Sequence, residues 1–90
     1  MSRRPGYAVL IKRTAEKEMD RLPARTFDRV ADAILRLETN PRPRGCRKLA
    51  GLEEYRLRVG AYRVLYTIDD ARQVVEVVAV GHRRDVYRGL

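Results

Sequence analysis

The fold is decided by residues 54–68, which read EYRLRVGAYRVLYTI. Before the glycine, apolar and charged side chains alternate strictly, which is typical of a strand with one buried face. Gly60-Ala61 then marks a tight turn, and a second strand-like run follows it. A two-residue hairpin at this turn predicts three cross-strand pairs: Val59 with Tyr62, Arg58 with Arg63, and Arg56 with Leu65.

Two more strands are predicted, one on each side of this hairpin in the sequence. Residues 7–12 are apolar and β-prone, and residues 73–80 are β-branched and apolar enough for a central strand that Gly81 ends. A short turn over residues 69–72 makes this last strand antiparallel to its predecessor. Its carboxyl end should therefore lie beside the Gly60-Ala61 turn.

Two helices are predicted between the first strand and the hairpin. Thr14 is a candidate cap for a short helix that starts at Ala15 and is broken by Pro23. A longer helix over residues 24–38 carries an apolar stripe that we assign to the core: Phe27, Val30, Ile34 and Leu37, widened by Ala31 and Leu35.

The element order β-α-α-β-β-β implies an α+β fold. We expect a single domain over residues 1–90, in which both helices pack on one face of a four-stranded, mostly antiparallel sheet. A short tail or helical turn should follow the last strand.

The charge of the chain indicates a polyanionic partner. Twenty basic residues against twelve acidic ones give a net charge of +8, and all the basic residues except Lys12, Lys17 and Lys48 are arginines. Arginine presents a planar fork of donors that suits phosphate, so nucleic acid or an acidic protein is the expected partner. Four cations without an acid lie close together in the predicted loop after the second helix, where we expect them to grip RNA: Arg42, Arg44, Arg47 and Lys48.

Several classes of protein are disfavoured by what the sequence lacks. Cys46 is the only cysteine, which excludes an intrachain disulfide and suits the reducing cytoplasm. The apolar runs are too short to span a membrane. One histidine and one cysteine far apart, with no glycine-rich phosphate loop, predict neither a metal site nor a cofactor.

The predicted hairpin brings arginines together on the face of the sheet opposite the apolar set. Arg56, Arg58 and Arg63 share this face, and like charges directly opposite each other are unfavourable in a sheet. They either splay apart into solvent or form a site for a phosphate. The predicted end of the last strand supports a site, because it adds a second group of candidate residues beside them: His82, Arg83 and Tyr87.

The spacing of four sequence blocks resembles the RelE branch of the RelE/ParE toxin superfamily. The blocks cover nearly the whole chain and read LAGL (49–52), YRLRV (55–59), YRVLY (62–66) and VGHRRDVY (80–87). The resemblance implies a ribosome-dependent, metal-independent endoribonuclease that cuts messenger RNA in the A site. It also implies a RelB-like antitoxin, acidic by charge complementarity, that wraps and inhibits the toxin.

The resemblance also suggests site residues, with two departures. Arg63, Arg83 and Tyr87 match residues of the family's motif, whereas Arg56 and Arg58 stand where the best-known enzymes have lysines. Arginine is a poor proton acceptor at a pKa of ~12.5–13.8. Tyr87 is therefore the first candidate for the general base, and His82 is the second.

The mechanism that follows is transesterification within RNA. The ribose 2′-OH attacks the adjacent phosphorus, Arg58, Arg63 and Arg83 stabilise the phosphorane, and a 2′,3′-cyclic phosphate and a 5′-hydroxyl result. Two alternatives remain on the sequence: a gyrase-inhibiting toxin of the ParE kind, and a catalytically inactive RNA- or antitoxin-binding module of the same fold.

Overall fold

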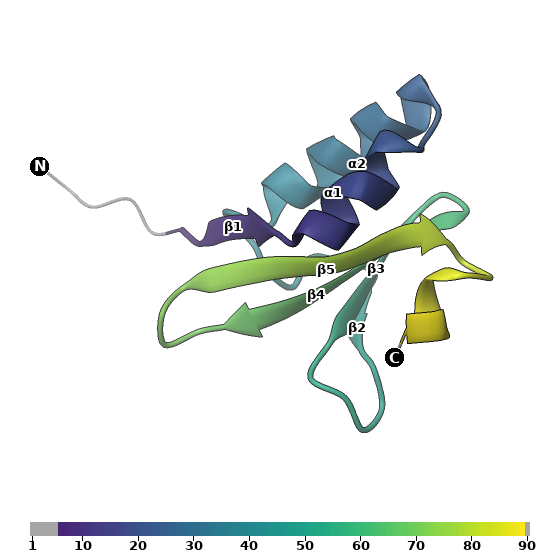
Figure 1. Ribbon diagram of the computed structural model, residues 1–90. Helices are drawn as coiled ribbons and strands as arrows, with labels where there is room; N and C mark the ends of the chain where they lie inside the picture. The colour runs from purple at the N-terminus through teal and green to yellow at the C-terminus, as the bar shows by residue number, and fades with distance from the viewer. Residues whose placement is uncertain (1–5, 90) are drawn as a thin grey trace, which may run out of the picture.

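The computed structural model describes residues 6–89 as two layers, a pair of helices on one face of a mixed sheet (Figure 1). The elements follow the chain as β1 (Ala8–Ile11), α1 (Arg13–Asp20), α2 (Ala24–Arg36), β2 (Cys46–Lys48), β3 (Tyr55–Val59), β4 (Tyr62–Asp69), β5 (Val74–His82) and the 3₁₀ turn η1 (Val86–Gly89). The predicted α+β class is confirmed.

The sheet has five strands among the described residues, not the predicted four, in the order β1-β5-β4-β3-β2. The additional strand is β2, which the sequence analysis placed in a basic loop. Its three residues are too few to show an alternating pattern, and it forms because it pairs with β3. The antiparallel pairing of β3, β4 and β5 is as predicted, whereas β1 pairs with β5 in parallel.

The predicted element ends are close to the observed ones, with two corrections. Helix α1 begins at Arg13 instead of Ala15, and Lys12, which has no side-chain capping bond, occupies the cap position assigned to Thr14. Strand β5 continues through His82, beyond the predicted end at Gly81. Gly81 has no positive φ that would break the strand, so pairing with β4 carries on past it.

A bulge in β5 sets which of its side chains face the helices. Leu65 pairs with Ala79 and Tyr66 pairs with Val77, so Val78 has no partner on β4. An extra residue of this kind shifts the alternation of a strand by one. Val77 and Val80 therefore both lie in the buried core although they are three residues apart.

The main core lies between the helices and the sheet. From α2 and the residue after it, Val30, Ile34 and Leu37 are buried as predicted, and they meet Leu57, Val64, Tyr66, Val75, Val77 and Val80 from the sheet. The rest of the predicted stripe is less covered. Phe27 and Ala31 are partly buried, and Leu35 remains 58% exposed.

The carboxyl-terminal turn η1 lies on the opposite face of the sheet from the helices (Figure 1). Val86 is buried there over Gly81, where an added Cβ would stand 3.6 Å from the Cβ of Val86. Leu65 is fully buried although it lies outside the main core. Since η1 contacts β4 and β5, it provides this part of the sheet with a small second core.

Candidate functional site

Four arginines from three strands share the face of the sheet that carries η1. Arg58 lies opposite Arg63 and Arg56 opposite Leu65, as the hairpin predicted. Strand β2 adds Arg47, which pairs with Arg56. Because paired residues in a sheet point to the same side, two Arg–Arg pairs stand next to each other in adjacent rows. We call these residues, Arg47, Arg56, Arg58 and Arg63, the arginine face.

Arg47 was expected in this region only as a loop residue that grips RNA. The short strand β2 changes its place, because the register of β2 against β3 sets it beside Arg56. The sequence shows that Arg47 belongs to a basic run, but it does not show that Arg47 pairs with Arg56. Arg44 is exposed in the turn before β2, and Lys48 pairs with Tyr55 on the helix side of the sheet.

Arg56 carries a buried donor without a partner. Its Nε is buried and makes no hydrogen bond to the described residues. A buried N–H left without an acceptor costs about 1–3 kcal/mol. Because this atom is closed to solvent, an anion at the arginine face could serve as its acceptor only after neighbouring atoms move aside.

Arg63 is the most buried member of the arginine face, at 9% exposure. Its Nη1 donates to the carbonyl oxygens of Gly60 at 2.9 Å and Tyr62 at 2.8 Å, which ties the guanidinium to the β3–β4 turn. Arg63 also lies opposite Gly81, over which Val86 of η1 packs. The guanidinium is therefore held in place before any ligand arrives.

Arg83 and Tyr87 reach this region from the carboxyl-terminal segment. The backbone N–H of Arg83 donates to the carbonyl of Ala61 at 2.9 Å, which holds the exposed Arg83 beside the β3–β4 turn as predicted. Tyr87 is half-buried in η1, next to the anchoring Val86. The backbone of both residues thus lies close to the face that carries the four arginines.

His82 is directed to the other face. It pairs with Tyr62, whose side lies toward the helices, and the two rings meet edge to face with their centroids 5.7 Å apart. Nδ1 of His82 accepts a hydrogen bond from the backbone N–H of Arg84 at 3.2 Å. In the neutral imidazole the proton then resides on Nε2, so the remaining nitrogen has no lone pair with which to take a proton.

Arg42 lies at the far end of the sheet, in a network that the sequence did not reveal. Its Nη1 and Nη2 donate to the carboxylate of Asp70 at 3.2 and 3.0 Å, and its guanidinium lies 5.3 Å from the ring centre of Tyr55. Tyr7 donates to the same carboxylate at 2.7 Å. The hydrogen bond from Arg42 lowers the pKa of Asp70, so both partners stay charged.

Tyr66 is excluded as a source of protons for chemistry. Its hydroxyl donates to the carbonyl of Pro41 at 2.8 Å inside the core. Burial raises the pKa of Tyr66 far above its ordinary value. Tyr87, in η1 on the other side of the sheet, is therefore the tyrosine left as a candidate.

Among residues 6–89, no group of three or more histidine, cysteine, aspartate or glutamate side chains is arranged to hold a metal ion. No helix in the same part of the chain is long and apolar enough to cross a membrane.

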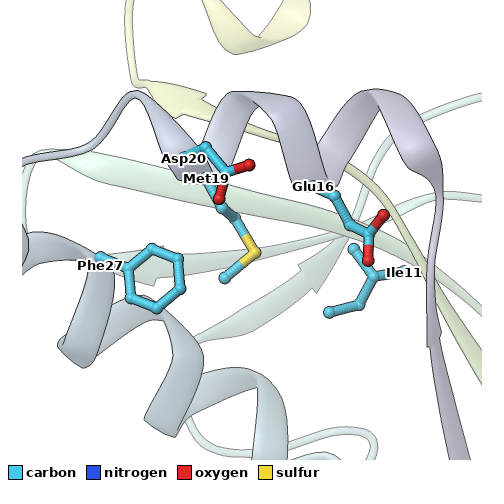
Figure 2. A pocket seen from close by; sticks show the side chains of 5 residues that line it. All are labelled: Ile11, Glu16, Met19, Asp20 and Phe27. Carbon is cyan, nitrogen blue, oxygen red and sulfur yellow. The ribbon is translucent and has the colours of Figure 1, made fainter.

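An apolar groove lies on the side of the molecule away from the arginine face. It has a volume of about 350 Å³ and runs between β1 and α2, lined by Val9, Ile11, Met19, Phe27, Ala31, Ile34, Leu35 and Glu38. A neighbouring pocket of about 300 Å³ shares Ile11, Met19 and Phe27 and adds two carboxylates, Glu16 and Asp20 (Figure 2). The combined surface is an apolar floor with an acidic rim.

Comparison with known proteins places the chain among bacterial and archaeal toxins. Residues 9–87 match the family described as ParE toxin of type II toxin–antitoxin system, parDE. The chain is 37% identical over 86 residues to the toxin RelG of Mycobacterium tuberculosis, an alignment covering 91% of this chain and 97% of that protein.

Solved structures agree with this placement. The RelBE2 toxin–antitoxin complex of M. tuberculosis matches with a TM-score of 0.78 at 31% identity, over 87% of this chain and 99% of the other. The archaeal RelE–RelB complex of Pyrococcus horikoshii matches with a TM-score of 0.78 at 29% identity, over 89% and 98% of the two chains. Both relatives were crystallised together with their antitoxins.

Proposed function

The chain belongs to the RelE/ParE toxin family and is a type II toxin of the RelE kind, and from this premise we propose that it is a ribosome-dependent endoribonuclease that cuts messenger RNA in the A site. The proposal rests above all on the arginine face. Two neighbouring Arg–Arg pairs repel each other unless a polyanion binds there. The toxin acts in the cytoplasm, where ribosomes and messages are found.

The chemistry is an attack of the ribose 2′-oxygen on the adjacent phosphorus. The new 2′-O–P bond forms, the bond from phosphorus to the 5′-oxygen breaks, and a 2′,3′-cyclic phosphate and a 5′-hydroxyl are the products. Arg58, Arg63 and Arg83 stabilise the charge that develops on the phosphorane. Arg56 contributes its positive charge to the binding of the neighbouring phosphate.

Two proton transfers accompany the reaction. The 2′-hydroxyl loses its proton to Tyr87, and the leaving 5′-oxygen receives one from a group of the site or of the ribosome. His82 has no part in accepting the proton, because its Nδ1 is engaged with the Arg84 backbone and its ring faces Tyr62. Its contacts with Tyr62 and with the Arg84 backbone instead fix the end of β5, which positions the following residue, Arg83.

The test compares wild-type toxin on programmed ribosomes and on the same message free in solution. We expect cleavage only on ribosomes, since no strong base is built into the site and the ribosome must align the 2′-oxygen with the phosphorus. Primer extension locates the cut, and end-specific ligation identifies the cyclic phosphate. Equal cleavage of free RNA contradicts the ribosome dependence.

A gyrase-directed toxin is the second candidate, because the matching family is described by its ParE members. In this case the message stays intact and a gyrase supercoiling assay shows inhibition at toxin concentrations that leave translation unaffected. An inactive module that binds only RNA or antitoxin leaves both the message and gyrase unchanged. The three outcomes are distinct in the same two assays.

The partner that neutralises the toxin is an acidic antitoxin of the RelB kind. The net charge of +8 and the arginine face supply attraction for acidic segments. The apolar groove supplies surface for an anchor, because Leu35 is 58% exposed there beside Phe27 and Ala31. The antitoxin therefore covers two faces of the toxin, one held by charge and one by apolar contact.

Leu35→Glu is expected to lower antitoxin affinity by about 30-fold or more, the size of a binding hot spot, and to leave cleavage on ribosomes unchanged. Leu52→Glu is the matched control, since Leu52 is also an exposed leucine but lies outside the groove. Calorimetric titration of toxin with antitoxin at several salt concentrations separates the charge contribution to affinity from the apolar contribution. A salt-independent affinity for wild-type toxin, or equal losses for the two variants, argues against two-faced coverage.

A further inference from the structure

A third cavity lies where α2 meets the β3–β4 turn, and of its lining only Arg58 has a part in the proposed chemistry. Its volume is about 330 Å³, and its lining consists of Arg29, Asp32, Ala33, Arg36, Arg58, Val59 and Gly60. Three of these seven residues are arginines and one is an aspartate, so the lining carries excess positive charge. We call this cavity the turn groove.

Only one of the three arginines is neutralised within the groove. Arg36 forms an ion pair with Asp32, with Nη2 and Oδ2 2.9 Å apart. Within residues 6–89, no hydrogen bond or ion pair engages the side chain of Arg29 or Arg58. Two arginines without a neutralising partner among these residues, one from α2 and one from β3, therefore line the same cavity.

The Arg29 guanidinium packs against the backbone of the β3–β4 turn at Gly60. Gly60 has a φ of 60°, which a glycine adopts without strain. A Cβ at this position would lie 3.4 Å from Nη1 of Arg29 and 3.5 Å from Nη2. The guanidinium thus lies over the bare backbone of Gly60, and this contact brings α2 to the edge of the arginine face.

We propose that the turn groove binds a backbone phosphate of RNA, held between Arg29 and Arg58, one step along the strand from the phosphate that is cleaved. The proposal rests on the proposed function, because Arg58 belongs to both the groove and the arginine face. A phosphate needs only guanidinium donors. A peptide would find little to bury, since Ala33 and Val59 are the only apolar side chains of the lining.

Arg29→Gln tests the groove by the salt dependence of toxin binding to programmed ribosomes. Loss of one phosphate contact lowers the slope of log affinity against log salt by about 0.7–0.9, which is roughly five- to eightfold in affinity at 0.1 M salt relative to 1 M. Arg25→Gln is the matched control, because Arg25 is exposed one turn earlier on α2 and does not line the groove. It should keep most of the wild-type slope.

Asp32→Asn tests the same groove by an increase in ribosome affinity, which a misfolded variant would not show. The substitution removes the only carboxylate of the lining and frees Arg36 from its ion pair. Ribosome affinity should rise several-fold at low salt and the slope should steepen. Asp28→Asn, an equal change of charge on the same helix outside the lining, should have a smaller effect.

The outcomes separate this proposal from the proposed function. If wild-type toxin cleaves message and the Arg29 and Arg25 variants behave alike, the turn groove holds no phosphate although the nuclease assignment stands. If Arg29→Gln weakens antitoxin binding and leaves ribosome binding intact, the groove serves an acidic protein and the proposal is wrong. If wild-type toxin does not cleave, the slopes still report whether RNA occupies the groove.

Discussion

Replacing Arg83 with alanine is expected to slow cleavage of ribosome-bound message by about 10²–10³-fold, the typical effect of removing one donor that stabilises a developing oxyanion. The fold should persist, because Arg83 is exposed and its backbone N–H, not its side chain, bonds to Ala61. Single-turnover cleavage with saturating toxin measures the loss apart from binding. Arg84→Ala is the control, since the neighbouring residue is also an exposed arginine.

Arg63→Ala should reduce cleavage by a similar factor, about 10²–10³-fold, but for two reasons. It removes a donor from the site, and it breaks the bonds from Nη1 to Gly60 and Tyr62 that hold the turn. Urea unfolding of the same variant separates the two effects. Arg42→Ala should leave the single-turnover rate unchanged, because Arg42 is engaged with Asp70 at the other end of the sheet. If Arg83→Ala and Arg63→Ala both cleave at the wild-type rate, the arginine face is not the active site.

Tyr87→Phe is expected to slow the chemical step by about 10²–10⁴-fold, the range for loss of a general base. The change keeps the ring and removes only the hydroxyl, so the packing of η1 through Val86 is preserved. Tyr62→Phe is the matched control, because Tyr62 lies on the other face against His82. Single-turnover rates over a range of pH give the comparison.

The alternative outcome for Tyr87→Phe is informative as well. A wild-type rate in this variant, together with an inactive Arg83→Ala variant, means that the proton leaves the 2′-hydroxyl to a group of the ribosome. His82 is the less favoured substitute, since its Nδ1 already accepts the Arg84 N–H. A His82→Gln variant should accordingly lose little activity beyond what it loses in stability.

The hairpin was predictable to the residue because local chemistry determines it. Gly60-Ala61 permits a two-residue turn, and that turn dictates the pairing of Arg58 with Arg63 and of Arg56 with Leu65. The alternation of apolar and charged residues then predicts which side of the hairpin faces the helices and which side carries the arginines. The membership of three of the four arginines in one face follows from these facts alone.

The residues that the sequence misplaced depend on contacts between distant segments. Strand β2 exists through its pairing with β3, so Arg47 was assigned to a loop. Arg42 is predicted to bind RNA, and its contacts with Asp70 and Tyr55, which come from separate parts of the chain, could not be read from the sequence. The side of the sheet that His82 occupies depends on the register of β5, which the sequence pattern does not reveal.

The bulge at Val78 has a consequence for how members of this lineage can diverge. All residues after it take their side of the sheet from that one unpaired position, because pairing resumes one step later with Leu65 against Ala79. Deleting Val78 would leave Ala79 opposite Leu65 and Gly81 opposite Arg63, so both sides of the sheet would be kept. One added residue that no bulge absorbs would instead exchange the two sides for Gly81 and everything beyond it, which would carry Arg83 and Tyr87 away from the arginine face. A shortened β5 without the bulge should therefore keep the toxin active, whereas a one-residue insertion that β5 cannot bulge out should inactivate it without unfolding the helices.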